Sequence, residues 1–102
     1  MHATIRRYDG VDQNRTAELT SKVNETLLPK LKLPGFAGYY LIEAGNGVFS
    51  SLGLFETPEQ GMESTNVAAT WIRDEKLNML IPNEPKVTSG QVIVHSNGVA
   101  VA

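Results

Sequence analysis

Residues 39–56 read YYLIEAGNGVFSSLGLFE, two runs of strand-forming residues on either side of an Asn46-Gly47 pair. Asn and Gly both tolerate the positive φ angles of a type I′ turn, so this stretch predicts a β-hairpin. Side chains point alternately to the two faces of a strand, yet neither run alternates cleanly between apolar and polar residues. Both faces of the hairpin are therefore apolar, and each must be buried against another surface.

A strand and a helix are expected before the hairpin. Residues 3–8, ATIRRY, predict a first strand that ends at an Asp-Gly pair typical of turns. A helix should follow from a cap at Asp12, because Leu and Val recur at four-residue spacing between positions 19 and 27. Pro29 removes a helical hydrogen bond, so we expect this helix to end near Leu28.

A second helix and a last strand are expected after the hairpin. TPEQ at 57–60 has the layout of a capping box, and the helix that begins there should run to about Leu80, before two prolines. Residues 90–95, GQVIVH, should form the last strand, followed by a tail at 96–102. The order strand, helix, strand, strand, helix, strand predicts one ferredoxin-like α+β domain over residues 1–95, with a four-stranded antiparallel sheet.

Two helices cover only one face of such a sheet. By alternation, Tyr39 and Leu41 share one face, while Tyr40 and Ile42 share the other. An uncovered apolar face of this kind would expose several hundred Å², which soluble monomers rarely tolerate. We therefore expect a homodimer in which the sheet faces cover each other.

Composition limits the partners and the chemistry. The chain has 102 residues, 41% of them hydrophobic and 20% charged, and its net charge is -2. It has no run of Lys or Arg to attract phosphate backbones, and GVFSSLGLF lacks the basic residue and aromatic spacing of RNA-recognition modules, so no nucleic acid partner is expected. Cysteine is absent, which excludes thiolate chemistry. No stretch has the ~18 apolar residues of a membrane span, and no signal segment is apparent, so we expect a cytoplasmic protein without a membrane partner.

Three motifs resemble those of the dimeric α+β barrel proteins related to the antibiotic biosynthesis monooxygenases. They are LPGFAGYYLIE, GVFSSLGLFETPEQ and AATWIRDE, and the resemblance extends over nearly the whole chain. It implies that two sheets pack face to face into a barrel. In members that act on small molecules, the pocket lies between the helices and the sheet of each subunit. The function implied is a cofactor-independent monooxygenase acting on a small aromatic or quinol-like substrate. The alternative is a non-catalytic homodimeric small-molecule-binding or stress-related protein.

The resemblance also directs attention to an Asn and a Trp on the second helix, for which Asn66 and Trp71 are the nearest candidates. Five residues span about 500° of helical rotation, so these side chains point ~140° apart and cannot both enter one pocket. Trp71 could instead pack the helix onto the sheet, and Asn66 could be exposed. Haem-degrading relatives add an iron-binding histidine on this helix. None is present here, so no haem or other cofactor is expected.

His95 is the candidate catalytic base, because antiparallel pairing of the first and last strands would place it on one face with Arg6 and Tyr8. A polar cross-strand cluster is the structural alternative. His2 is expected to face His95, but two imidazoles without a carboxylate do not make a zinc site, so no metal is predicted.

Arg6 and Arg7 must point to opposite sides of the first strand, so at least one guanidinium lies near a buried face. That guanidinium either pairs with Glu43 or Glu56 or holds an anionic ligand. Three tyrosines could pack with their hydroxyls at a solvent-exposed edge or line a pocket for an aromatic ligand, namely Tyr8, Tyr39 and Tyr40.

Overall fold

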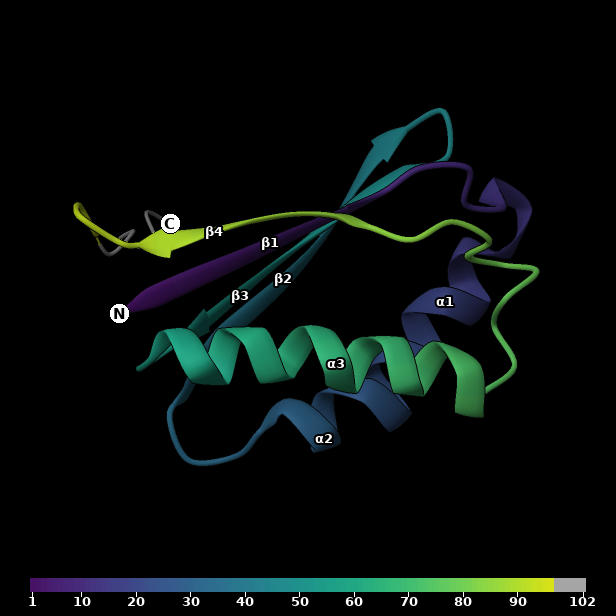
Figure 1. Ribbon diagram of the computed structural model, residues 1–102. Coiled ribbons are helices and arrows are strands. Elements are labelled where there is room, and N and C mark those ends of the chain that lie inside the picture. Colours follow the sequence, from purple (N-terminus) through teal and green to yellow (C-terminus); the bar gives the residue numbers. More distant parts are fainter. Residues whose placement is uncertain (97–102) are drawn as a thin grey trace, which may run out of the picture.

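A computed structural model describes residues 1–96, in which a four-stranded antiparallel sheet carries its helices on one face (Figure 1). The strands are β1 (His2–Tyr8), β2 (Phe36–Gly45), β3 (Val48–Phe55) and β4 (Lys86–Gln91), and their order across the sheet is β2-β3-β1-β4. This is the predicted ferredoxin-like α+β arrangement. Of the predicted tail at 96–102, residues 97–102 lie outside the described part of the chain.

The β2–β3 hairpin turns where the sequence predicted it. Asn46 and Gly47 have φ angles of 54° and 76°, both positive, as a type I′ turn requires. The turn packs against the segment that follows β1, because the Val11 amide donates to the Gly47 carbonyl at 3.0 Å. A Cβ atom on residue 47 would lie 2.9 Å from the carbonyl oxygen of Val11, so this position requires glycine for space as well as for φ.

The first helical segment is longer than predicted. It consists of η1 (Gln13–Arg15), α1 (Thr16–Lys22), η2 (Val23–Leu27) and α2 (Leu28–Leu31). Asp12 caps it as expected, but the prediction that the helix ends near Leu28 is wrong. The turn before Pro29 is η2, a π-helical stretch whose hydrogen bonds span one residue more than those of an α-helix. Pro29 then fits within the first turn of α2, where a missing amide costs little.

Helix α3 (Pro58–Asp74) begins with the predicted capping box but ends earlier than expected. The predicted end near Leu80 is wrong because the chain leaves the helix in a Schellman motif. Lys76 adopts a left-handed φ of 57°, and the amides of Lys76 and Leu77 donate to carbonyls of the last helical turn at 3.2 and 2.8 Å. The following residues then form turns on the way to β4.

Strand β4 lies earlier in the chain than the predicted strand at residues 90–95. Its register places Gln91 opposite His2, so pairing with β1 ends where β1 begins. The Val92 amide still donates to the carbonyl of Met1 at 2.9 Å, but residues 92–96 contain no strand. The β-branched run at 92–94 has strand propensity but no partner strand within residues 1–96.

The sheet face that turns away from the helices is apolar, and residues 1–96 leave it uncovered, as the sequence predicted. Tyr40, Leu52 and Ile5 form a row across three neighbouring strands. Tyr40 is 60% exposed, Ile42 50% and Ile5 40%. We call this surface the open face and define it by Ile5, Tyr40, Ile42, Leu52 and Leu54.

Candidate functional site

The candidate site is a buried pocket between the sheet and the helices. β1 contributes Arg6 and Tyr8, β2 contributes Tyr39 and α3 contributes Trp71. Leu and Val side chains of α1 and η2 line the pocket from the helix side, and the remaining lining residues are also apolar, namely Val11, Leu41, Phe49, Ala68 and Ile81. The free space is about 20 Å³, which is room for a water molecule and not for a substrate. The pocket is therefore closed in this conformation.

Arg6 brings a positive charge into this apolar interior. Its side chain is fully buried, with 1% of the residue exposed, whereas Arg7 points to the other side and pairs with Asp9 at 3.2 Å. The Arg6 Nη1 donates to Ser64 Oγ at 3.1 Å, and its Nε has no hydrogen-bond partner in the described part of the chain. Within residues 1–96 Arg6 forms no ion pair, so the predicted pairing with Glu43 or Glu56 is wrong. Both glutamates are exposed and stay in solvent.

Three buried hydroxyl side chains lie on the same side of the sheet as Arg6. Thr4 lies two residues before it on the same face of β1, Ser51 is its cross-strand partner on β3, and Ser64 reaches it from α3. Among the residues that the structure describes, the hydroxyls of Thr4 and Ser51 have no hydrogen-bond partner. We call Thr4, Arg6, Ser51 and Ser64 the Arg6 cluster. Sequence reasoning missed the three hydroxyl residues, although Ser51 stands at an inward position of a strand where phenylalanines occupy other inward positions.

Close packing of α3 against β1 brings Ser64 to Arg6. Gly61 lies one turn before Ser64, and a Cβ atom on it would collide with the Thr4 hydroxyl. Ser64 Oγ donates to the carbonyl of Gly61 at 2.6 Å, which fixes the hydroxyl for the bond from Arg6. Glycine at this position therefore sets the separation of helix and strand at the Arg6 cluster.

Tyr39 and Tyr8 lie on the helix side of the sheet, and Tyr40 does not. Burial raises the pKa of the Tyr39 hydroxyl, and the positive charge of Arg6 opposes that rise. Tyr39 is therefore a neutral hydrogen-bonding group at ordinary pH. Tyr40 belongs to the open face, so it cannot contribute to this pocket within one subunit.

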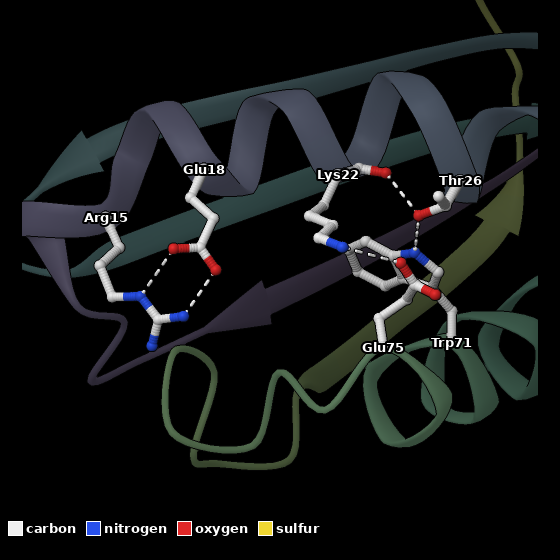
Figure 2. Close-up of polar contacts among 6 residues, drawn as sticks. All are labelled: Arg15, Glu18, Lys22, Thr26, Trp71 and Glu75. Carbon is white, nitrogen blue, oxygen red and sulfur yellow. Dashed lines mark hydrogen bonds and ion pairs between the residues drawn. The ribbon is translucent and has the colours of Figure 1, made fainter.

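Trp71 both packs the helix and lines the pocket. Its indole N–H donates to Thr26 Oγ1 at 2.7 Å, and the Thr26 hydroxyl donates to the Lys22 carbonyl at 2.8 Å (Figure 2). Lys22 Nζ pairs with Glu75 Oε1 at 3.1 Å beside them (Figure 2). These polar contacts join the first helical segment to α3 and hold the helical wall of the pocket in place.

Asn66 and His95 are not brought to the pocket. Asn66 is exposed on α3, as the helical rotation between it and Trp71 predicted. His95 is exposed beyond the end of β4, so the expectations that it shares a face with Arg6 and Tyr8 and lies opposite His2 are wrong. In the part of the chain that the structure describes, no three His, Asp or Glu side chains gather as a metal site. Over the same residues, no helix has the length and apolarity to cross a bilayer.

Comparison with known proteins gives matches in structure alone. No family model and no curated protein matches the chain. The putative antibiotic biosynthesis monooxygenase from Nitrosomonas europaea has a TM-score of 0.70 at 12% identity, covering 92% of this chain and 100% of that chain. The haem-degrader MhuD from Mycobacterium tuberculosis, with two haems in its active site, has a TM-score of 0.69 at 16% identity, covering 95% and 100%.

A third similar structure is a monooxygenase from the gene ActVA-Orf6 of Streptomyces coelicolor in complex with Nanaomycin D. Its TM-score is 0.63 at 13% identity, and the match covers 99% of this chain and 91% of that chain. At such identities these similarities define a fold and leave the activity open. The chain has the ferredoxin-like α+β fold of antibiotic biosynthesis monooxygenase-like proteins, which confirms the predicted fold of one subunit, while the barrel of two packed sheets stays a prediction.

Proposed function

We propose that this protein is a homodimeric, cofactor-independent monooxygenase that acts on a small aromatic or quinol-like substrate in the pocket beneath its helices. The observation that carries the proposal is that Arg6, Tyr8, Tyr39 and Trp71 line one buried pocket. The similar structures include a monooxygenase in complex with Nanaomycin D and a haem-degrader, which supports small-molecule chemistry in this fold. A cytoplasmic location remains part of the proposal.

In the proposed reaction the substrate is its own reductant. Loss of a proton from an acidic phenol or enol gives a carbanion, which passes electrons to dioxygen; one oxygen atom enters the product and the other leaves as water. The protein has to stabilise the anion and exclude bulk water, and a buried guanidinium among apolar walls suits both tasks. Trp71 would hold the aromatic ring. Catalytic roles for Asn66 and His95 stay predictions, since neither side chain lines the pocket.

Dimerisation through the open face belongs to the same proposal. The row formed by Tyr40, Leu52 and Ile5 offers a contiguous apolar surface. The cationic residues Arg7 and Lys86 are cross-strand partners toward one end of the sheet, outside this row. Packing two such faces together would remove the apolar rows from water and form the expected barrel. Light scattering at micromolar concentration tests this arrangement.

An oxygen electrode tests the activity. Purified protein without added metal or flavin should consume oxygen with at least one member of a panel of hydroquinones and polyphenols. Trp71→Phe should lower the rate by about tenfold or more, because the pocket loses both ring area and the hydrogen bond to Thr26. Met79→Ala, at a side chain that is 84% exposed, is the matched control and should keep the wild-type rate. Absence of uptake across the whole panel would overturn the oxygenase.

One observation favours the alternative, a homodimeric small-molecule-binding protein without turnover. The pocket wall contains no carboxylate and no imidazole among residues 1–96, so it offers no ordinary general base. Ligand binding without oxygen uptake would identify this second function. If the substrate loses its proton to solvent before it binds, the pocket needs no general base, and the oxygenase proposal still holds.

A further inference from the structure

The Arg6 cluster is a buried concentration of hydrogen-bond donors with a net positive charge. Arginine cannot lose its charge by deprotonation in a protein, unlike lysine or histidine. A charge removed from water is costly unless an opposite charge or a full set of hydrogen bonds compensates it. Arg6 donates a hydrogen bond to Ser64 and forms no ion pair over residues 1–96. Its charge is therefore left without a counter-charge in this conformation.

Three buried atoms of the cluster have no hydrogen-bond partner within residues 1–96. Arg6 Nε can only donate, and the hydroxyls of Thr4 and Ser51 can donate as well as accept. Ser51 is the cross-strand partner of Arg6, so its hydroxyl and the guanidinium project from neighbouring positions on the same face of the sheet. A guanidinium flanked by hydroxyl donors is the arrangement that binds an oxyanion through charge-assisted hydrogen bonds.

We infer that the Arg6 cluster is an anion-binding subsite, and that the pocket takes a small aromatic monoanion whose charged oxygen binds Arg6. This inference deepens the proposed function, because Arg6 lines that pocket, although the three hydroxyl residues of the cluster do not line it. A single cation matches a single negative charge, and a dianion would leave an excess charge buried. The ring of the ligand would lie against the aromatic wall formed by Tyr8, Phe49 and Trp71. Phenolate, enolate and carboxylate share the required charged oxygen.

Access to the subsite requires movement of the helical wall. The free space of about 20 Å³ holds a water molecule, so a phenyl ring fits only when α1 and η2 move away from α3. The bond from Trp71 to Thr26 and the ion pair between Lys22 and Glu75 close this seam (Figure 2). Water alone can fill the closed pocket, but it brings no compensating charge.

Intrinsic fluorescence provides a direct binding assay, because Trp71 is the one tryptophan in the chain and lines the pocket. Benzoate and benzyl alcohol are probes of nearly equal size that differ in charge. Benzoate should change the emission of Trp71 and raise the melting temperature. The affinity for benzyl alcohol should be lower than that for benzoate by about tenfold or more. Equal affinity for the two probes, or no binding of benzoate, would overturn the inference.

Variants of Arg6 test whether its charge causes the preference for benzoate over benzyl alcohol. Arg6→Met keeps a long apolar side chain, so it should abolish the preference for benzoate and melt at the wild-type temperature or above, since a buried uncompensated charge is removed. Arg6→Lys should retain the preference at lower affinity. Benzoate binding that is unchanged in Arg6→Met would overturn the inference. If Arg6→Met does not fold, the comparison of the two probes on the wild-type protein still decides.

The assay separates this inference from the proposed activity. Benzoate is a binding probe whose detection needs no turnover. Benzoate binding together with no oxygen uptake from any quinol would support the subsite and overturn the oxygenase. Oxygen uptake together with equal binding of benzoate and benzyl alcohol would support the oxygenase and overturn the subsite.

Discussion

Arg6 is the residue on which both the pocket and the inferred anion subsite depend, because it brings a buried positive charge to the pocket wall. Alternation along β1 required one of two adjacent arginines to face the interior, and Arg6 does so. Its partner could not be predicted, because Ser64 comes from a helix whose rotation about its axis is set by packing and by Gly61. The sequence therefore identified the buried charge, and tertiary packing decided which groups meet it.

Tyr39 gives a prediction at the same scale. Burial raises its pKa in the folded state above the usual value of 10.0, while the unfolded chain keeps that value. As pH rises above about 10, the unfolded state loses its proton first, so the stability contributed by neutral Tyr39 is full below this pH and falls above it. Tyr39→Phe should make the free energy of unfolding decline less steeply between about pH 9 and pH 11 in urea titrations.

The control for this prediction is Tyr40→Phe, one residue away on the open face. It removes a hydroxyl from the same strand without altering the pocket. An equal change of slope in both variants would contradict the assignment to Tyr39. Measurement at a protein concentration that keeps one oligomeric state removes the contribution of association.

At the scale of elements, helix beginnings were predicted better than helix ends. The capping box at Thr57 and Gln60 uses side chains whose hydrogen bonds are local, so the start of α3 follows from the sequence. The end of α3 depends on Lys76 in a left-handed conformation, which its side chain does not favour. The π-helical stretch η2 could not be predicted either, because nothing in the residue types of a π-helix distinguishes it from an α-helix.

Lys76→Gly is therefore expected to stabilise the protein. Glycine adopts the left-handed conformation without the Cβ penalty, and the gain should exceed its greater entropy in the unfolded chain. We expect the free energy of unfolding to rise by about 0.5 kcal/mol and the melting temperature to rise with it. Lys76→Val, which strongly disfavours a positive φ, should lower both, and a fall in the glycine variant would contradict the Schellman assignment.

At the scale of the whole molecule, the fold followed from two patterns in the sequence. The element order predicted the sheet, and the failure of the hairpin to alternate predicted an apolar face away from the helices. The last strand was placed too late because local propensity favoured the Val-rich run at 92–94, while the register with β1 selected residues 86–91. Residues brought together by tertiary structure, such as the Arg6 cluster, were not predictable from spacing.

The proposed dimer gives a prediction at this scale. Leu52 lies at the centre of the open face, between Tyr40 and Ile5, so Leu52→Glu would place a charge in the middle of the contact. We expect the wild-type protein to have a dimer mass in light scattering and the variant a monomer mass, because burying an unpaired carboxylate is costly. Met79→Glu, at an exposed site, should keep the dimer mass. A monomeric wild-type protein would overturn the dimer.

The π-helical stretch from Val23 to Leu27 makes the length of the first helical segment as important as its composition. Loss of one residue there would convert the wide turn to an ordinary one and leave the residues after it facing the same way, because five residues in a π turn complete about the same rotation as four in an α turn. Leu31 would stay in the interior, but the ring of Pro29 would meet a regular helix. Loss of one residue elsewhere in the segment would turn Leu31 by about 100° and out of the interior, so the wide turn is the one place where a change of length is tolerated. Alignments with relatives whose helix lacks the wide turn should place their gap inside the helix, between Leu19 and Leu31.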